Sequence, residues 1–442
     1  MPKQIQSKSS ENIYYSRRSR VLKSIRGEVA VFPGGARKSS SGDQSYPFVQ
    51  DANFFYLTGF MEEQAVLVLS GSNKGPRSVL FLKDRDAAHE KWEGERLGLK
   101  RAKRKFRIDE VRPIEALNAD LPALLRSAKT LHYAPGVNSL TDQLIWRLIQ
   151  SPVGPRVNFP NILKDSRLML SEMRFVKDRS EIAMLRHASD ITAHSLRKVV
   201  PLLAKFKSEK HCARVLEENF AQLGAGGLAF ETIVAAGKHA TVLHHRPQLT
   251  PLWKRELVLI DTGAQFRGYA ADISRTLPVS GKFSTAQAEL YDVVLHAREE
   301  AQRKAIIGGS LDSIHDAAVR ELAKGLVNLG IVNGPVNEVI NKGLYRRFYP
   351  HRTGHYLGLD VHDIAPITET GSSTAIPLVA GNALTIEPGL YFDAKDDQVP
   401  REYRGIGIRI EDSVLVTAGE PEILTAAMPT ARSEIEALMN NG

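Results

Sequence analysis

The chain has 442 residues, of which 43% are apolar and 25% charged, and its formal net charge is +9. This length predicts two or three domains of ordinary size, and the composition excludes collagen-like, disordered and coiled-coil proteins. No apolar run approaches the ~20 residues that span a bilayer, so an integral membrane protein is excluded and no membrane partner is expected.

The cysteine content and the first residues bear on the compartment. The lone Cys212 cannot form an internal disulfide, which favours a reducing environment. The opening MPKQIQSKSS has neither the apolar core nor the cleavage site of a secretory signal. We therefore expect a cytoplasmic protein. A transit peptide is the alternative, but the apolar run at 28–33 is typical of a folded strand.

Positive charge is concentrated in the N-terminal third. Residues 1–150 contain 25 basic and 16 acidic residues, whereas the remaining residues contain 34 of each. Six of the eight residues at 100–107 are Lys or Arg. Such a run is compatible with a nucleic-acid partner or with a solvated helix face. We favour the solvated face and expect no nucleic acid, because no recognition helix, zinc-finger spacing or RNA-binding aromatic signature accompanies the run.

The N-terminal third is predicted to be mixed α/β. Apolar runs at 65–69 and 78–82 predict strands, which alternate with predicted helices at 114–127 and 140–149. Pro, Gly and Asn gather at 151–161, as is typical of a linker. A new helix is predicted to begin at Asp178, because Asp178 and Glu181 have capping-box spacing. We place the domains at 1–172 and 173–442.

The C-terminal domain mixes helices and strands without the repeated strand–helix–strand rhythm of a parallel sheet, which predicts an α+β fold. The predicted helices are 210–223, 286–305 and 311–330, and the predicted strands are 257–261, 271–277, 383–387 and 406–416. The sequence contains no glycine-rich nucleotide-binding fingerprint and no GxSxG motif. Nucleotide-dependent chemistry and serine hydrolysis therefore lack support.

Residues 256–278 predict a β-hairpin that carries an aspartate on each arm. A two-residue turn at Phe266–Arg267 would place Asp261 directly opposite Asp272, and a bulge at Gly268 would shift that register by one. Cross-strand neighbours lie about 4.5–5.5 Å apart at Cβ, where like charges are destabilising. The pair therefore indicates a cation between the two carboxylates, unless both point to solvent.

Two further carboxylates lie in apolar surroundings. Glu387 ends the run ALTIE, and Glu411 lies inside GIGIRIEDSVLV on the same strand face as Arg409. A buried ionised group costs several kcal/mol unless it is paired or coordinated. Glu411 is therefore expected either to pair with an arginine or to bind a metal.

Histidines gather among glycines in PHRTGHYLGLDVHD, which holds His351, His355 and His362. Gly354 and Gly358 argue against a regular helix there, and the grouping favours a site. His244 and His245 form a further pair, for which a structural and a functional role are equally open.

The carboxylates and at least one imidazole form an oxygen-rich set. Hard divalent ions suit it, Mn²⁺ best and then Co²⁺ or Zn²⁺, and the single cysteine excludes a thiolate site. Several carboxylates able to bridge are more than one ion needs, which predicts two metals roughly 3.5–4 Å apart.

Four segments resemble, in order and spacing, the pita-bread metallopeptidases and in particular the bacterial aminopeptidase P (Xaa-Pro aminopeptidase) family: LVLIDTGAQFRGYAADISRT, HRTGHYLGLDVHD, LTIEPGLY and EYRGIGIRIED. NFFYLTGF at 53–60 and KWEGERLG around Trp92 resemble that family's N-terminal domain. The resemblance implies a smaller mixed α/β domain followed by a pita-bread catalytic domain, in a homodimer or homotetramer.

The resemblance also implies roles for individual residues. The implied metal ligands, of which Asp272 and Glu411 would bridge, are Asp261, Asp272, His355, Glu387 and Glu411. The implied contacts to substrate or intermediate are His244, His351 and His362. Tyr391 and Arg409 are implied to lie behind the ligands, and Trp92, from the same or a neighbouring subunit, is implied to help close the site.

The implied activity is removal of the first residue from peptides with proline in second position, by attack of a hydroxide that bridges the metals. Glu387 is expected to move the proton to the proline nitrogen. Arg352 and Gly354 depart from many bacterial members. HRTGH is closer to some prolidases, in which case Arg352 would grip a substrate carboxylate; otherwise it points outward. EYRGIGIRIED and its preceding acidic insert favour the aminopeptidase. A metal-free pita-bread binding module is the alternative from another class, but all five ligands are present.

Overall fold

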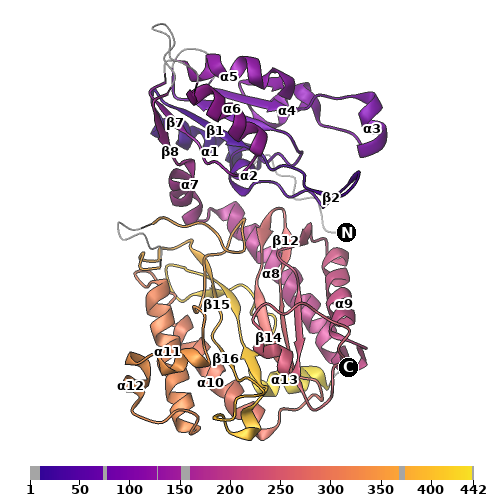
Figure 1. Ribbon diagram of the computed structural model, residues 1–442, viewed down its shortest axis with the longest axis vertical. Coiled ribbons are helices and arrows are strands. Elements are labelled where there is room, and N and C mark those ends of the chain that lie inside the picture. Colours follow the sequence, from indigo (N-terminus) through magenta and orange to yellow (C-terminus); the bar gives the residue numbers. More distant parts are fainter. Residues whose placement is uncertain (1–9, 73–76, 127, 151–159, 368–373, 441–442) are drawn as a thin grey trace. The chain divides into compact units, whose positions relative to one another are not determined.

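A computed structural model describes residues 10–72, 77–126, 128–150, 160–367 and 374–440. The chain divides into two compact units, Met1–Met173 and Arg174–Gly442 (Figure 1). The boundary expected from the sequence is residue 172. Most of the predicted linker, 151–159, lies outside the described residues. In the described parts of the chain, no helix is both long enough and apolar enough to cross a membrane.

The first unit is built on a six-stranded mixed sheet in the order β6-β5-β4-β1-β7-β8. Its strands are β1 (Val29–Pro33), β4 (Val66–Ser70), β5 (Ser78–Leu82), β6 (Glu110–Pro113), β7 (Thr130–His132) and β8 (Ile162–Lys164). The central β1 is antiparallel to β4 and parallel to β7. The two strands predicted at 65–69 and 78–82 are β4 and β5.

Helices complete this unit. They are α1 (Ser10–Ser24), α2 (Ala52–Thr58), α3 (Ala87–Glu93), α4 (Gly98–Phe106), α5 (Leu117–Leu125), α6 (Ser139–Gln150) and α7 (Ser166–Phe175), which crosses the unit boundary, with a small exposed hairpin of β2 (Ser39–Ser41) and β3 (Gln44–Ser45). One core joins α5 and α6 to alternate residues of β1, β4 and β5. On α4, Ala102 and Phe106 are buried, whereas the six basic side chains at 100–107 are exposed, as a solvated helix face predicts.

Among the described residues of the second unit, all strand pairings are antiparallel, and they are arranged in small sheets. The first sheet holds β10 (Ile233–Ala236), β11 (Leu257–Thr262) and β14 (Ile273–Pro278), and the second holds β15 (Ala383–Ile386), β18 (Asp412–Leu415) and β19 (Glu422–Ile423). The third sheet holds β9 (Gly227–Leu228), β12 (Ala264–Phe266) and β13 (Tyr269–Ala270). The fourth sheet pairs β16 (Gly389–Tyr391) with β17 (Gly407–Arg409). This mixture agrees with the predicted α+β class.

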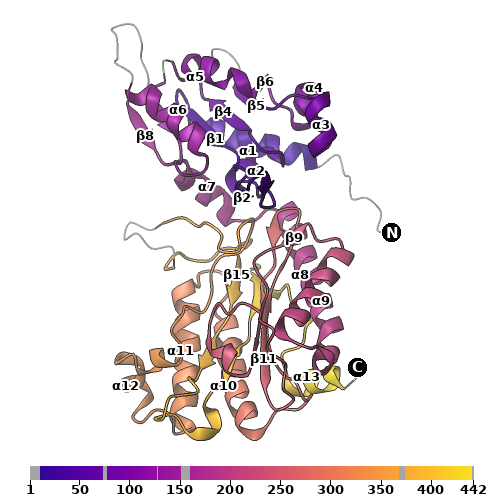
Figure 2. The same cartoon turned by 45° about the vertical axis from the view of Figure 1, so that its right-hand side comes forward.

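Helices flank these strands on two sides, α8 (Arg179–Val199) and α9 (Glu209–Gln222) on one and α10 (Thr285–Gln302) and α11 (Leu311–Asn328) on the other (Figure 2). Two shorter helices follow, α12 (Val336–Asn341) and α13 (Arg432–Met439). Asp178 caps α8 in a capping box with Glu181, as predicted. Apolar residues of α8, α9, α10, α11 and β11 share one continuous core, which makes the strands a rigid support for the side chains at their ends.

Candidate active site

The hairpin of β11 and β14 positions two aspartates, although in a register different from the predicted one. Asp261 pairs with Ser274, not with Asp272, and the turn lies one residue later, at Arg267–Gly268. Both turn residues have positive φ, +50° and +89°, as a type I′ turn requires, and Gly268 adopts such angles without strain. The alternative of a bulge at Gly268 is not realised either, because the ladder keeps the same register on both sides of Gly263.

The error in pairing is two residues, an even number. Side chains alternate between faces with a period of two, so Asp272 lies on the same face as Ser274 and stays a diagonal neighbour of Asp261. Both aspartates are buried, at 9% and 5% exposure, which excludes the alternative in which they point to solvent.

Glu387 and Glu411 enter the same space from other sheets. Glu387 directly follows β15, and its backbone N–H donates to the carbonyl of Thr353. The long strand predicted at 406–416 is wrong: β17 ends at Arg409 and β18 begins at Asp412, because the two pair with different partners, β16 and β15. Glu411 lies in this break, where its Oε2 accepts a hydrogen bond from Ser274 Oγ at 3.0 Å.

The histidine-rich segment at 350–363 is irregular, as its glycines predicted. A Cβ on Gly354 would lie 2.0 Å from the carbonyl oxygen of Thr385, so only glycine permits this approach to β15. His355 Nδ1 donates to the carbonyl of Tyr356 at 3.0 Å. This bond leaves Nε2 facing Asp272 Oδ2 at 3.5 Å and Glu387 Oε1 at 3.7 Å, which is the orientation of a metal ligand.

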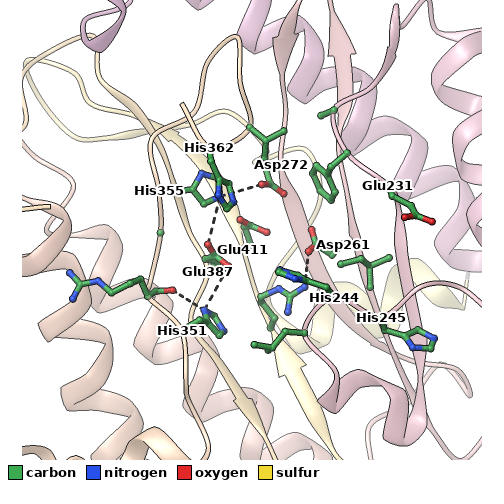
Figure 3. Close-up of a pocket in the computed structure, with 18 of the residues that line it drawn as sticks. Glu231, His244, His245, Asp261, Asp272, His351, His355, His362, Glu387 and Glu411 are labelled. Carbon is green, nitrogen blue, oxygen red and sulfur yellow. Dashed lines mark hydrogen bonds and ion pairs between the residues drawn. The ribbon is translucent and has the colours of Figure 1, made fainter. Parts of the chain in front are cut away.

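These side chains surround one cavity of about 910 Å³ (Figure 3). Nine of the residues predicted from the sequence line it: His244, Asp261, Asp272, His351, His355, His362, Glu387, Arg409 and Glu411. Tyr391 lies behind the lining, and its hydroxyl contacts His351 Nε2 at 2.8 Å and Arg409 Nη1 at 3.1 Å. Trp92 belongs to α3 of the first unit, where it is 88% exposed.

Arg409, the arginine on the predicted strand face of Glu411, pairs with Asp261. Its Nη2 donates to Asp261 Oδ2 at 2.6 Å and its Nε donates to Ser274 Oγ at 2.9 Å. Glu411 therefore has no arginine partner of its own among the described residues, and the ion-pair interpretation of Glu411 fails.

The carboxylate set fits metal ions. Among the described residues, nothing donates a hydrogen bond to the buried Oδ1 atoms of Asp261 and Asp272. Buried anionic oxygens without donors are costly unless a cation balances them. Ligand atoms of Asp272, His355 and Glu411 also lie within 4.8 Å of one another. Burial, followed by the neighbouring carboxylates, raises the pKa of Asp272 and of Glu411 well above the usual values, which reflects crowding of like charge.

Other functional features of the cavity escaped prediction. Apolar side chains, Phe230, Ile233, Leu243 and Val361, form part of its wall. Nothing in the local sequence distinguishes them from core residues. Ser274, which orients both Glu411 and Arg409, could have been found, since it lies two residues from Asp272 and therefore on the same strand face.

Comparison with known proteins identifies the family. Residues 183–418 match metallopeptidase family M24, and residues 14–133 match the aminopeptidase P N-terminal domain. The chain belongs to metallopeptidase family M24. A similar M24 relative is the Xaa-Pro aminopeptidase of Haemophilus influenzae, 38% identical over 97% of both chains; that of Escherichia coli is 37% identical over 98% of both.

Solved structures extend the likeness to the whole fold. Pseudomonas aeruginosa aminopeptidase PepP superposes with a TM-score of 0.93 at 34% identity, and E. coli aminopeptidase P with the inhibitor Pro-Leu with 0.92 at 35%. Each match covers 98% of both chains. The predicted fold, a mixed N-terminal domain followed by a pita-bread domain, is confirmed.

Proposed function

We propose that this protein is a metal-dependent aminopeptidase that removes the N-terminal residue from peptides whose second residue is proline. The observation that carries the proposal is the convergence of four carboxylates and His355 on one cavity, with buried carboxylate oxygens that lack donors among the described residues. Likeness to Xaa-Pro aminopeptidases over nearly the whole chain supports the substrate class.

The proposed metal ligands are Asp261, Asp272, His355, Glu387 and Glu411, with Asp272 and Glu411 bridging two ions. We propose Mn²⁺ as the resident ion, since oxygen ligands dominate the set. When bound, the ions would polarise the scissile carbonyl and lower the pKa of a water held between them.

The histidines divide into two kinds by their hydrogen bonds. Both nitrogens of His351 are occupied: Nδ1 donates to the Arg352 carbonyl at 2.8 Å, and Nε2 accepts from the Tyr391 hydroxyl. Burial lowers the pKa of His351 to about 4, so its ring is neutral and suits a wall for the proline ring. His244 and His362 make no hydrogen bond to another described residue, and we assign them to the substrate carbonyl and its developing oxyanion.

Glu387 is assigned to proton transfer. The proline nitrogen must gain a proton before it can leave, and an Xaa-Pro amide carries none of its own. A carboxyl oxygen of Glu387 inside the cavity can deliver it. Because the same amide has no N–H to recognise, we propose that the apolar wall, which includes Phe230 and Val361, reads the shape of the proline ring.

Arg352 bears on the prolidase alternative. It lines the cavity and its side chain is 50% exposed, so it is available to a substrate carboxylate. Its guanidinium, however, is ion-paired with Asp312, which also accepts a hydrogen bond from Thr374 Oγ1 at 3.3 Å. An arginine whose charge is already balanced is a weak receptor for a free carboxylate, which favours the aminopeptidase.

The remaining expectations concern assembly and location. We propose a cytoplasmic homodimer or homotetramer in which the exposed Trp92, from the same or a neighbouring subunit, helps close the site. Equilibrium sedimentation of the wild type and of Trp92→Ala, together with the KM of each for a tripeptide, tests this assignment. An unchanged KM would remove Trp92 from the site.

The deciding experiment compares two substrates after Mn²⁺ loading, an Xaa-Pro-Yaa tripeptide and the matching Xaa-Pro dipeptide, with products identified by mass. We expect release of the first residue from the tripeptide and little cleavage of the dipeptide. Cleavage of the dipeptide alone would establish a prolidase. Cleavage of neither, with metal confirmed in the site, would overturn the proposed substrate.

A further inference from the structure

A cluster of one buried carboxylate and two histidines, Glu209, His239 and His245, lies beside the cavity. Glu209, in the first turn of α9, is fully buried. Its Oε1 accepts hydrogen bonds from the backbone N–H of Ala236 at 2.9 Å and from His239 Nδ1 at 2.8 Å. Its Oε2 accepts from His245 Nε2 and from the backbone N–H of Gln248, both at 2.9 Å. Each oxygen therefore has two donors.

Three side chains of metal-binding type meet here, as they would in a metal site. The bonding argues for another role, because two of the four donors are backbone amides, which cannot make way for an ion without opening the chain. The rings of His239 and His245 stack on each other at 4.4 Å and 27°. Burial alone would raise the pKa of Glu209, but the donated hydrogen bonds outweigh burial and lower it, so the carboxylate stays charged.

The cluster fastens the segment that carries His244. This segment leaves β10 at Ala236 and runs past the cavity to Gln248, and Glu209 bonds to it at both ends and twice between. Two backbone bonds add to this attachment: the N–H of Glu209 donates to Thr250 O at 3.0 Å, and that of Lys210 donates to Gln248 O at 2.9 Å.

His244 itself has no such support. It is exposed within the cavity and makes no hydrogen bond or ion pair with another described residue. Figure 3 shows His244 beside Asp261, whereas the neighbouring His245 points away from the carboxylates. The attachment of His244 to Glu209 therefore runs through its backbone, which is held on one side by the buried ring of His245.

We propose that Glu209 is a positioning residue for His244: it binds His239, His245 and two backbone amides so that the His244 ring is held at the substrate carbonyl. The inference rests on the proposed function, in which His244 contacts the substrate. Displacement of a catalytic contact by about 1 Å can cost on the order of a hundred-fold in rate. Glu209 thus acts on the reaction without touching substrate or metal.

The test is a double-mutant cycle in the full-length, Mn²⁺-loaded protein with a tripeptide substrate. Glu209→Gln keeps the shape but replaces one acceptor oxygen by an amide nitrogen that cannot accept. We expect kcat/KM to fall about ten- to a hundred-fold, with two metal equivalents retained. In a His244→Ala background the same change should cost less than about two-fold, because the group that it positions is gone. Glu218→Gln, on the exposed side of the same helix, should leave kcat/KM unchanged.

Each other outcome overturns the proposal. An equal loss in both backgrounds would mean that Glu209 supports the fold or the metals and not His244. Loss of a third metal equivalent in Glu209→Gln would make the cluster a metal site. If His244→Ala alone has full activity, the role of His244 fails, whereas absence of any Xaa-Pro cleavage by the wild type would refute the proposed function itself.

A second pair of variants covers the case in which Glu209→Gln does not fold. His245→Gln places an amide N–H near the position of Nε2 and should retain activity within about two-fold. His245→Met removes the donor at similar size and should reproduce the loss in kcat/KM. Equal activities of these two variants would contradict the positioning role.

Discussion

Two regions of the second unit bury carboxylates in opposite ways. In the cavity, four carboxylates share few donors, and the Oδ1 atoms of Asp261 and Asp272 accept no hydrogen bond from described residues. Three buried carboxylates around the cavity are matched by donors or cations: Glu209 by four donors, Asp363 by Arg174 and Lys177, and Asp412 by Arg275 and Arg298. Buried charge is present in both regions, so it does not by itself indicate a binding site for cations. The shortage of donors for the buried carboxylate oxygens does.

The largest effect on activity is expected from removing the charge of a cavity carboxylate. Asp272→Asn should lower kcat/KM by at least about a thousand-fold, because the metals supply several kcal/mol of transition-state stabilisation. The same change relieves repulsion from Asp261 and Glu387, so the metal-free protein should melt at a higher temperature than the metal-free wild type. Activity assays and thermal denaturation with and without chelator measure both effects.

Chelation provides the control for this variant. Metal at about a hundred times its Kd should stabilise the wild type by about 2.7 kcal/mol, and the gain should be strongly reduced in Asp272→Asn. A melting temperature of the wild type that is insensitive to chelator, with no metal by elemental analysis, would instead support a metal-free binding module.

The next largest effect is expected on stability, from removing one of the matched carboxylates around the cavity. Asp363 lies beside His362 and is paired with Arg174 and Lys177, all three side chains being about 1–2% exposed. Asp363→Asn would leave the buried Lys177 ammonium without its carboxylate partner, while Arg174 would keep its ion pair with Asp360, at a cost of about 3–5 kcal/mol. Denaturant unfolding followed by a probe in the second unit measures this loss. Asp360→Asn, which removes the more exposed carboxylate partner of Arg174 (48% exposed), is the matched comparison and should cost less.

The pH dependence of this stability has a defined sign. Burial raises the pKa of Asp363, but Lys177 and Arg174 outweigh it and lower the pKa below the usual value. A depressed carboxyl pKa stabilises the fold fully above the unfolded value of about 3.9, and the contribution is lost as pH falls below that value towards the folded pKa. As the pH falls below about 4, the free energy of unfolding of the wild type should therefore decrease more than that of Asp363→Asn. Parallel pH profiles would refute the assignment.

The smallest effect is expected from Arg352, which lines the cavity but whose ion pair is exposed to solvent. Its pair with Asp312 is about half exposed, and exposed pairs contribute about 0–1 kcal/mol. Arg352→Ala should leave stability nearly unchanged and tripeptide cleavage within about three-fold. A large rise in KM for an Xaa-Pro dipeptide would show instead that Arg352 holds a substrate carboxylate.

The cavity residues were predictable because their chemistry conflicts with their surroundings. Asp261, Glu387 and Glu411 stand out as charges in apolar runs, and the glycines around His355 exclude a helix. The matched carboxylate Glu209 gave no such signal, because it opens a helix, where an acidic residue is ordinary. Its partners at 236–248 are distant in sequence, so the pairing depends on tertiary structure. The break after β17 was missed because strand partners, which differ for β17 and β18, cannot be read from alternation alone.

The pairing register set by the turn at Arg267–Gly268 decides which residues of the second arm enter the cavity. A slip of this register by one residue would turn the second arm over and carry Asp272 out of the cavity, leaving an apolar neighbour in its place. A slip of two residues would keep Asp272 on the face that it now occupies. The register of the hairpin is therefore as much a part of the site as the aspartates themselves.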